Sequence, residues 1–280
     1  MSSGPFAKVT KNLKIRGTGI RNTPFATADV WAYNRYAYTG TFDRSCGTDE
    51  SGVWIWDVRN KKKVKFVGII TSPIGSRASD VKVAAMNSGD ILVHSNQDCD
   101  GGNVPPYVPG RGGFEIYNAN DPTNPVHLAS VQTDDVNAFL RDNFTLTDLG
   151  VNNVFLFTKG IKDYVAAVVN SDFGNFQIFD ITNPRNPSLV GYWGAEQLNQ
   201  TEVTDWASLD DEAIINEARA YLNDGYGDDG DRFLRDITIT ADGKHAYVSS
   251  DLVIIIILYY SFCSYVLCIV SMPRWVLSYP

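Results

Sequence analysis

The chain has 280 residues, of which 44% are hydrophobic and 20% charged, a composition typical of a globular protein. Its formal net charge of −8 argues against nucleic acid as a partner, because phosphate backbones attract basic surfaces. The basic run Lys61–Lys63 is too short to change this and is interpreted as a solvated turn. Residues 1–27 contain no uninterrupted apolar stretch of the kind that a secretory signal requires, so no signal peptide is recognised.

We expect residues 1–11 to form a disordered tail and residues 12–251 to form a set of repeats. The clearest repeated segment is Gly52–Asp57, which returns as Gly113–Asn118 and as Asn175–Asp180, with starts 61 and 62 residues apart. Each copy alternates β-branched and aromatic residues, which favours a strand, and a turn rich in Asp, Asn and Pro follows the second and third copies. A second short strand follows each turn. A repeat of this length indicates a modular architecture.

Two further strand-like segments precede each copy. They are Ala28–Trp31 and Tyr36–Gly40 in the first unit, Ser79–Val83 and Ile91–His94 in the second, and Asn153–Phe157 and Tyr164–Val169 in the third. About four short antiparallel strands per unit is the content of a β-propeller blade. The sequence therefore predicts an all-β protein, a β-propeller with two short helical insertions and an incomplete ring.

The two insertions interrupt the repeats at residues 134–145 and 196–231. The first has apolar residues at helical spacing after acidic residues that suit a helix N-terminus. The second has a capping sequence at Ser208 and an apolar face from Ala213 to Leu222. Both helices are expected on loops at one rim of the propeller, where we expect an unidentified protein or carbohydrate ligand to bind.

A fourth unit begins at Phe233–Thr240 and His245–Ser249, but no further signature strand follows. Instead the chain enters an apolar tail, residues 252–280, in which the 19 residues from Leu252 to Val270 carry no charge. Three interpretations are open: a transmembrane anchor, which would make the membrane a partner; a buried strand pair of the last blade; or foreign sequence from a frameshift or an unspliced segment. The abrupt change in mid-blade favours the third.

The repeated signature strand, its Asn-Pro turn and the strand after it resemble those of the LVIVD-repeat β-propeller proteins. The matching segments are Gly52–Gly68, Gly113–Ser130, Phe176–Gly191 and Phe233–Ser249. The resemblance implies a propeller outside the cytoplasm, extracellular or on the cell surface, with no well-defined enzymatic activity. It supplies no catalytic residues for this chain.

Local signals for chemistry are few. Cys46 and Cys99 lie in equivalent loops, and a disulfide between them and a pair of free thiols are equally open interpretations. Asp228, Asp229 and Asp231 lie among glycines and could supply oxygen ligands to Ca²⁺, but a solvated acidic turn is the preferred interpretation. We therefore expect no cofactor and no catalytic residue.

Two function hypotheses follow. The first is a non-catalytic propeller for ligand or protein binding, adhesion or scaffolding. The second is a metal-dependent hydrolase or lactonase-like propeller, which would need acidic residues from several blades to meet at the axis. Asp29, Asp80 and Asp236 occupy equivalent positions in three units, but such placement more often indicates a repeated structural hydrogen bond than a metal site. We prefer the first hypothesis.

Overall fold

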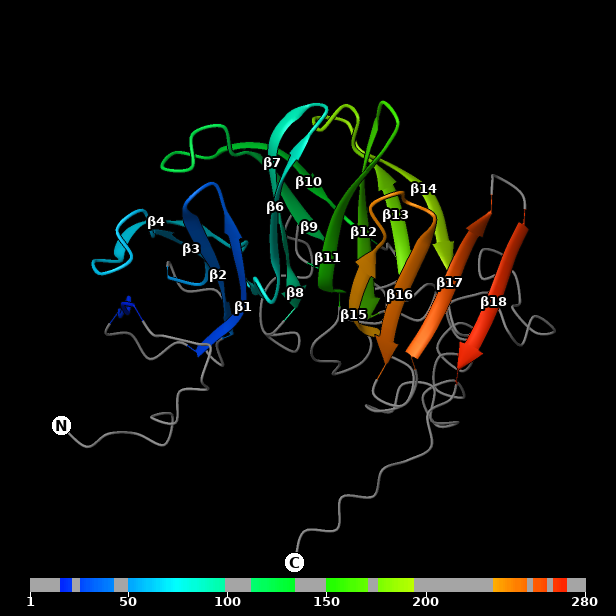
Figure 1. The fold of residues 1–280 in the computed structure, drawn as a ribbon, viewed down its shortest axis with the longest axis horizontal. Coiled ribbons are helices and arrows are strands. Elements are labelled where there is room, and N and C mark those ends of the chain that lie inside the picture. Colours follow the sequence, from blue (N-terminus) through cyan, green and yellow to red (C-terminus); the bar gives the residue numbers. More distant parts are fainter. Residues whose placement is uncertain are drawn as a thin grey trace, which may run out of the picture.

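The computed structural model describes residues 16–21, 26–42, 50–98, 112–133, 150–170, 176–193, 234–250, 254–260 and 264–270. Within these ranges the chain forms strands and connecting turns, arranged as four antiparallel sheets (Figure 1). The all-β class and the four-stranded unit predicted from the repeats are thereby confirmed. The predicted tail 1–11 and the predicted helical insertions at 134–145 and 196–231 lie outside the described residues.

The first three sheets each contain one copy of the signature strand in third position. The first sheet runs β1 (Ala26–Tyr33), β2 (Tyr36–Phe42), β3 (Gly52–Asp57) and β4 (Lys65–Thr71). The second has the order β6 (Val81–Met86), β7 (Gly89–Ser95), β9 (Phe114–Asn118) and β10 (Val126–Val131). The third has β11 (Gly150–Lys159), β12 (Lys162–Asn170), β13 (Phe176–Asp180) and β14 (Ser188–Trp193), and the short strands β8 (Gln97–Asp98) and β5 (Ser76–Arg77) extend it beyond β11.

The fourth sheet includes part of the apolar tail. It runs β15 (Leu234–Ile239), β16 (His245–Ser250), β17 (Ile254–Tyr260) and β18 (Ser264–Val270), so the predicted boundary at residue 251 falls inside the sheet. Residues 254–260 and 264–270 of the tail thus form two strands of this sheet, and the three interpretations of the tail stay predictions. Within the described ranges, no helix has the length and apolar character needed to cross a lipid bilayer.

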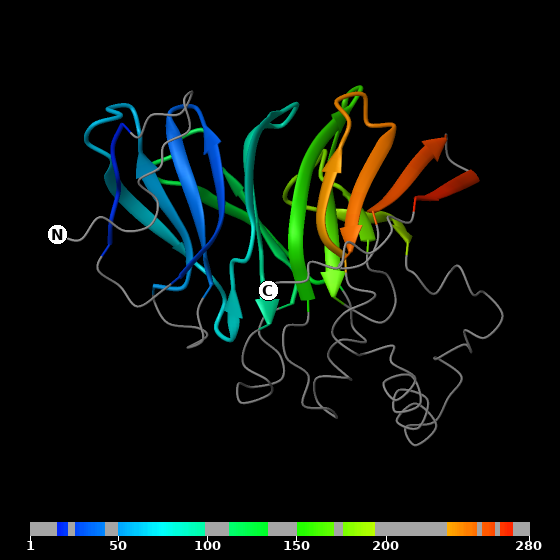
Figure 2. The ribbon, with the colours of Figure 1, turned by 60° about the horizontal axis from the view of Figure 1, so that its bottom comes forward.

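The four sheets follow one another in chain order, each packed against the next, and both views show the same succession (Figures 1 and 2). Their first strands, β1, β6, β11 and β15, contact one another in sequence. Three buried apolar clusters fill the three interfaces between successive sheets. Full burial of a valine or leucine side chain stabilises a fold by ~1.5–3 kcal/mol, so these interfaces hold the arrangement together.

The aromatic residues of the signature strands divide between two environments. Phe176 and Phe179 lie in the apolar clusters between sheets. Trp54 and Trp56 instead point to the other face of the first sheet, where no other sheet of the described chain lies. There the Arg21 guanidinium lies 4.8 Å from the centre of the Trp54 ring. The segment 16–21 therefore covers part of this face.

Candidate functional site

One cleft is lined by residues from the first strands of all four sheets and by Ser79 and Asp80, which directly precede the first strand of the second sheet. Its volume is about 440 Å³, and its lining includes Asp29, Asp80, Asn153 and Asp236. These four residues occupy the same register position, because each directly precedes a β-branched residue of the first strand: Val30, Val81, Val154 or Ile237. The three aspartates that the sequence placed in equivalent positions are therefore brought to one site.

The local backbone explains why these side chains reach the cleft. The strand pairing shifts register between Thr27 and Val30 in β1, between Val151 and Asn153 in β11, and between Leu234 and Asp236 in β15. A β-bulge of this kind bends the strand and changes the direction of the neighbouring side chain. The repeated irregularity thus gives Asp29, Asn153 and Asp236 a similar position at the start of their sheets, whereas Asp80 directly precedes β6, whose pairing with β7 has no such shift.

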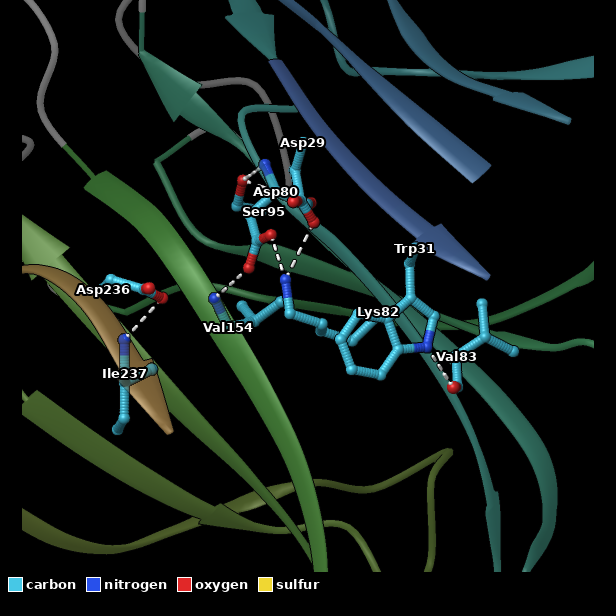
Figure 3. A network of polar contacts seen from close by, with 9 residues as sticks. All are labelled: Asp29, Trp31, Asp80, Lys82, Val83, Ser95, Val154, Asp236 and Ile237. Atoms are coloured by element: carbon cyan, nitrogen blue, oxygen red, sulfur yellow. Dashed lines mark hydrogen bonds and ion pairs between the residues drawn. The ribbon is translucent and has the colours of Figure 1, made fainter. Parts of the chain in front are cut away.

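A buried ammonium group lies between two of the carboxylates (Figure 3). Lys82 Nζ donates to Asp29 Oδ2 at 2.8 Å and also to Asp80 Oδ1. The Asp80 side chain is only 2% exposed and that of Lys82 9%, whereas Asp29 is 30% exposed. The backbone N–H of Val154 donates to Asp80 Oδ2 at 2.7 Å. Asp80 and Lys82 therefore join the first three sheets through one polar network.

The electrostatics of this network fix the charge of the lysine. Burial and the adjacent Asp29 raise the pKa of Asp80, against the opposing effect of Lys82. Burial acts to raise the pKa of Asp29 as well, but hydrogen bonds with Asp80 and Lys82 outweigh it, and that pKa is lowered. Burial would lower the pKa of Lys82, yet the two carboxylates reverse this and raise it. Lys82 is therefore held as an ammonium and is not available as a nucleophile or base.

Two further side chains of the cleft, Asp236 and Asn153, carry hydrogen-bond acceptors. Asp236 is exposed, and its Oδ1 accepts a hydrogen bond from the adjacent backbone N–H of Ile237 at 2.8 Å. The Oδ1 atom of Asn153 is buried, and no described group donates to it. Trp31 lies beside Lys82, and its Nε1 donates to the carbonyl oxygen of Val83 at 2.7 Å. The cleft thus presents carboxylate and amide oxygens beside an aromatic ring, which suits a ligand with hydroxyl or ammonium groups.

Sequence reasoning identified some of these residues and missed others. Lys82 and Asn153 were not singled out, although a lysine two positions after Asp80 and an asparagine at the equivalent position of the third unit were visible. The other sequence candidates lie outside the described residues: Cys46, Cys99, Asp228, Asp229 and Asp231. In the part of the chain that the structure describes, no group of three or more His, Cys, Asp or Glu residues is arranged to hold a metal ion.

The three histidines lie away from this cleft. His94 is buried against the ring of Tyr117, with the ring centres 5.7 Å apart. His127 Nε2 lies 2.6 Å from Glu115 Oε2. His245 lines a separate, mostly apolar cavity of about 120 Å³ between the third and fourth sheets.

Comparison with known proteins gives similarity in three-dimensional structure only. No family model and no curated protein matches the chain. Among solved structures, it is similar to a functionally unknown protein from Desulfotomaculum acetoxidans, with 13% identity and a TM-score of 0.45 over 88% of this chain and 55% of that one. A protein from Lactobacillus plantarum has 10% identity and a TM-score of 0.48, over 85% of this chain and 54% of that one.

A hypothetical selenium-binding protein from Sulfolobus tokodaii is similar at 12% identity and a TM-score of 0.45, over 82% of this chain and 50% of that one. The chain thus spans about half the length of these three solved proteins. At these levels of identity and structural agreement, the comparisons give no information about ligand or activity.

Proposed function

We propose that this chain is a β-propeller protein of the LVIVD-repeat type, extracellular or on the cell surface, that binds a ligand without chemical turnover. Two features support the propeller. The signature strand takes the third position in three successive sheets, and the first strands of all four sheets contact one another. Successive sheets of this kind, with their first strands innermost, are the arrangement of propeller blades.

The observation that carries the binding function is the cleft at these first strands. Asp29 and Asp236 expose carboxylate oxygens to it from the first and fourth sheets. Lys82 is engaged by Asp29 and Asp80 and neutralises part of their charge. The exposed carboxylates favour a ligand that donates hydrogen bonds, and a saccharide of the kind expected for a surface-exposed binding protein fits this chemistry.

Calorimetric titration with a panel of neutral oligosaccharides tests this function. We expect at least one to bind the wild-type chain and to bind Asp236→Asn roughly tenfold to a hundredfold more weakly, since one charge-assisted hydrogen bond contributes ~1.5–3 kcal/mol. Asp242→Asn is the matched control, because Asp242 lies on the same sheet in the turn between β15 and β16, outside the cleft lining. Absence of binding across the panel, or equal affinities for the two variants, would contradict the proposal.

A metal-dependent hydrolase or lactonase-like enzyme is the second candidate. It is favoured by one observation, that aspartates from the first, second and fourth sheets line the same cleft. The Lys82 ammonium between Asp29 and Asp80 weighs against it, because a cation already occupies the position between these carboxylates. Metal analysis of the purified chain separates the two candidates. One tightly bound divalent ion per chain, lost in Asp80→Asn together with lactone hydrolysis, would support the enzyme, and a chain without bound metal would exclude it.

A further inference from the structure

The four successive sheets form a row, called the arc below, and neighbouring sheets of the arc pack through the same kind of interface three times. The first and the fourth sheet each leave one side of this interface without a partner sheet among the described residues. Each internal interface pairs a residue of one sheet's second strand with the β-branched residue of the next sheet's first strand. The pairs share one buried cluster each: Tyr38 with Val81, Val93 with Val154, and Ala166 with Ile237. All six of these residues are at most 3% exposed.

The equivalent positions at the two ends are exposed. Val30 is the residue of the first sheet that is equivalent to Val81 of the second, and it is 64% exposed because no described sheet precedes it. Tyr247 is the residue of the fourth sheet that is equivalent to Tyr38 of the first, and it is 41% exposed. The first sheet therefore leaves open the face on which a preceding sheet would pack. The fourth sheet leaves open the face that would pack on a following sheet.

We propose that a second copy of this chain supplies both missing partners, so that two copies associate head to tail and Tyr247 of each packs on Val30 of the other. The argument is continuity with the three internal interfaces, since the two open faces are the two complementary halves of the same repeated contact. Head-to-tail contacts form a closed assembly when the rotation between copies completes a turn. Two arcs of four sheets give about eight, within the range of closed propellers.

The face of the first sheet around Val30 is accessible for such a contact. Around Val30, the exposed face of the first sheet also includes Ala32, and the segment 16–21 lies farther out over Trp54 and Trp56. The inner part of the face, next to the cleft, is therefore open. The proposal rests on the propeller arrangement proposed above but not on its ligand. Saccharide titration therefore tests ligand binding, and light scattering tests the dimer, and either hypothesis can be contradicted without the other.

Light scattering coupled to size-exclusion chromatography tests the proposal on the full chain over a range of concentrations. We expect a dimer, and we expect Val30→Arg to raise its dissociation constant roughly thirtyfold or more, as for a central interface residue. Val126→Arg is the matched control, because Val126 is a comparably exposed valine (52%) on β10, at the outer edge of the second sheet. Circular dichroism verifies that both variants retain β structure.

A cysteine pair tests the head-to-tail geometry. When chains carrying Val30→Cys are mixed with chains carrying Tyr247→Cys, we expect a disulfide-linked dimer that neither variant forms alone. A wild-type chain that is monomeric at every concentration would overturn the proposal and would indicate that the open faces are covered by another sheet. A larger assembly that Val30→Arg leaves unchanged would overturn it as well.

Discussion

The carboxylate of Asp163, at the start of β12, accepts hydrogen bonds from both the backbone N–H and the hydroxyl of Ser88, each at 2.8 Å. Its other oxygen accepts two more from Asn87, in the same turn between β6 and β7. Asp163 is fully buried, so the second and third sheets are joined here by a polar contact as well as by an apolar cluster. A related contact links the first two sheets, where the Tyr33 hydroxyl donates to Asp90 at 2.8 Å.

Removal of the Asp163 carboxylate should therefore destabilise the fold. We expect Asp163→Ala to lower the free energy of unfolding by ~1–3 kcal/mol, because the partly buried hydrogen bonds from Asn87 and Ser88 lose their acceptor. Asp163→Asn keeps one acceptor oxygen and should cost less. Chemical denaturation of the three proteins measures the difference, and equal midpoints for the alanine variant and the wild type would show that this contact contributes nothing.

Lys82→Met tests the buried ion pairs of the cleft. The substitution leaves the Asp29 and Asp80 carboxylates without their counter-charge, and breaking a buried pair in this way costs ~3–5 kcal/mol. Lys162→Met is the control, because Lys162 pairs with Asp180 on the surface at 2.8 Å and its side chain is 53% exposed. We expect this control to change stability little. Similar urea midpoints for the two variants would contradict the burial of Lys82.

The glycine that opens the signature strand is required by its surroundings. Gly52 has a φ of 144°, and a Cβ atom there would overlap the carbonyl oxygen of Ile70. Gly52→Ala should therefore cost at least about 2 kcal/mol of unfolding free energy. Gly68, on β4 of the same sheet, has open space where a Cβ atom would lie, with no other atom within 4 Å, so Gly68→Ala should be nearly neutral. Thermal melts of both variants decide the point.

His94 predicts a dependence of stability on pH. Burial lowers the pKa of His94 from the usual 6.5 to about 4, so between these values the unfolded chain binds a proton that the folded chain does not. The contribution of the neutral His94 imidazole to the free energy of unfolding is therefore fully present above pH 6.5. It is lost as the pH falls toward 4, and it amounts to on the order of 3 kcal/mol. His94→Gln lacks this titration. We expect the stability difference between wild type and His94→Gln to shrink over this range, and a constant difference would contradict the burial of a neutral imidazole.

The strands were predictable because alternation and turn residues are local properties of the sequence. Gly52–Asp57 was predicted with the same bounds as β3, and the other signature strands differ by one residue. The equivalent aspartates were also visible, since their register within each repeat is fixed by the strand that follows. The sequence did not show that these aspartates meet in one cleft, because this depends on how the sheets are placed relative to one another.

The role of Lys82 illustrates the same limit. On β6 it alternates with Val81 and Val83, so the sequence alone presents it as one more polar residue on a half-buried strand. Only the position of β1 shows that Asp29 lies 2.8 Å from its ammonium group. The exposed faces marked by Val30 and Tyr247 are likewise a property of the arc and not of any single strand.

A double-mutant cycle on Asp29 and Lys82 tests most directly the claim that neighbouring sheets bring their charged residues into one cleft. Asp29 belongs to the first sheet and Lys82 to the second, 53 positions further along the chain. Unfolding free energies of the wild type, Asp29→Ala, Lys82→Ala and the double variant give the coupling energy between the two side chains. We predict a coupling of about 1 kcal/mol or more. A coupling of zero would mean that the two side chains do not meet and that the cleft does not have the described architecture.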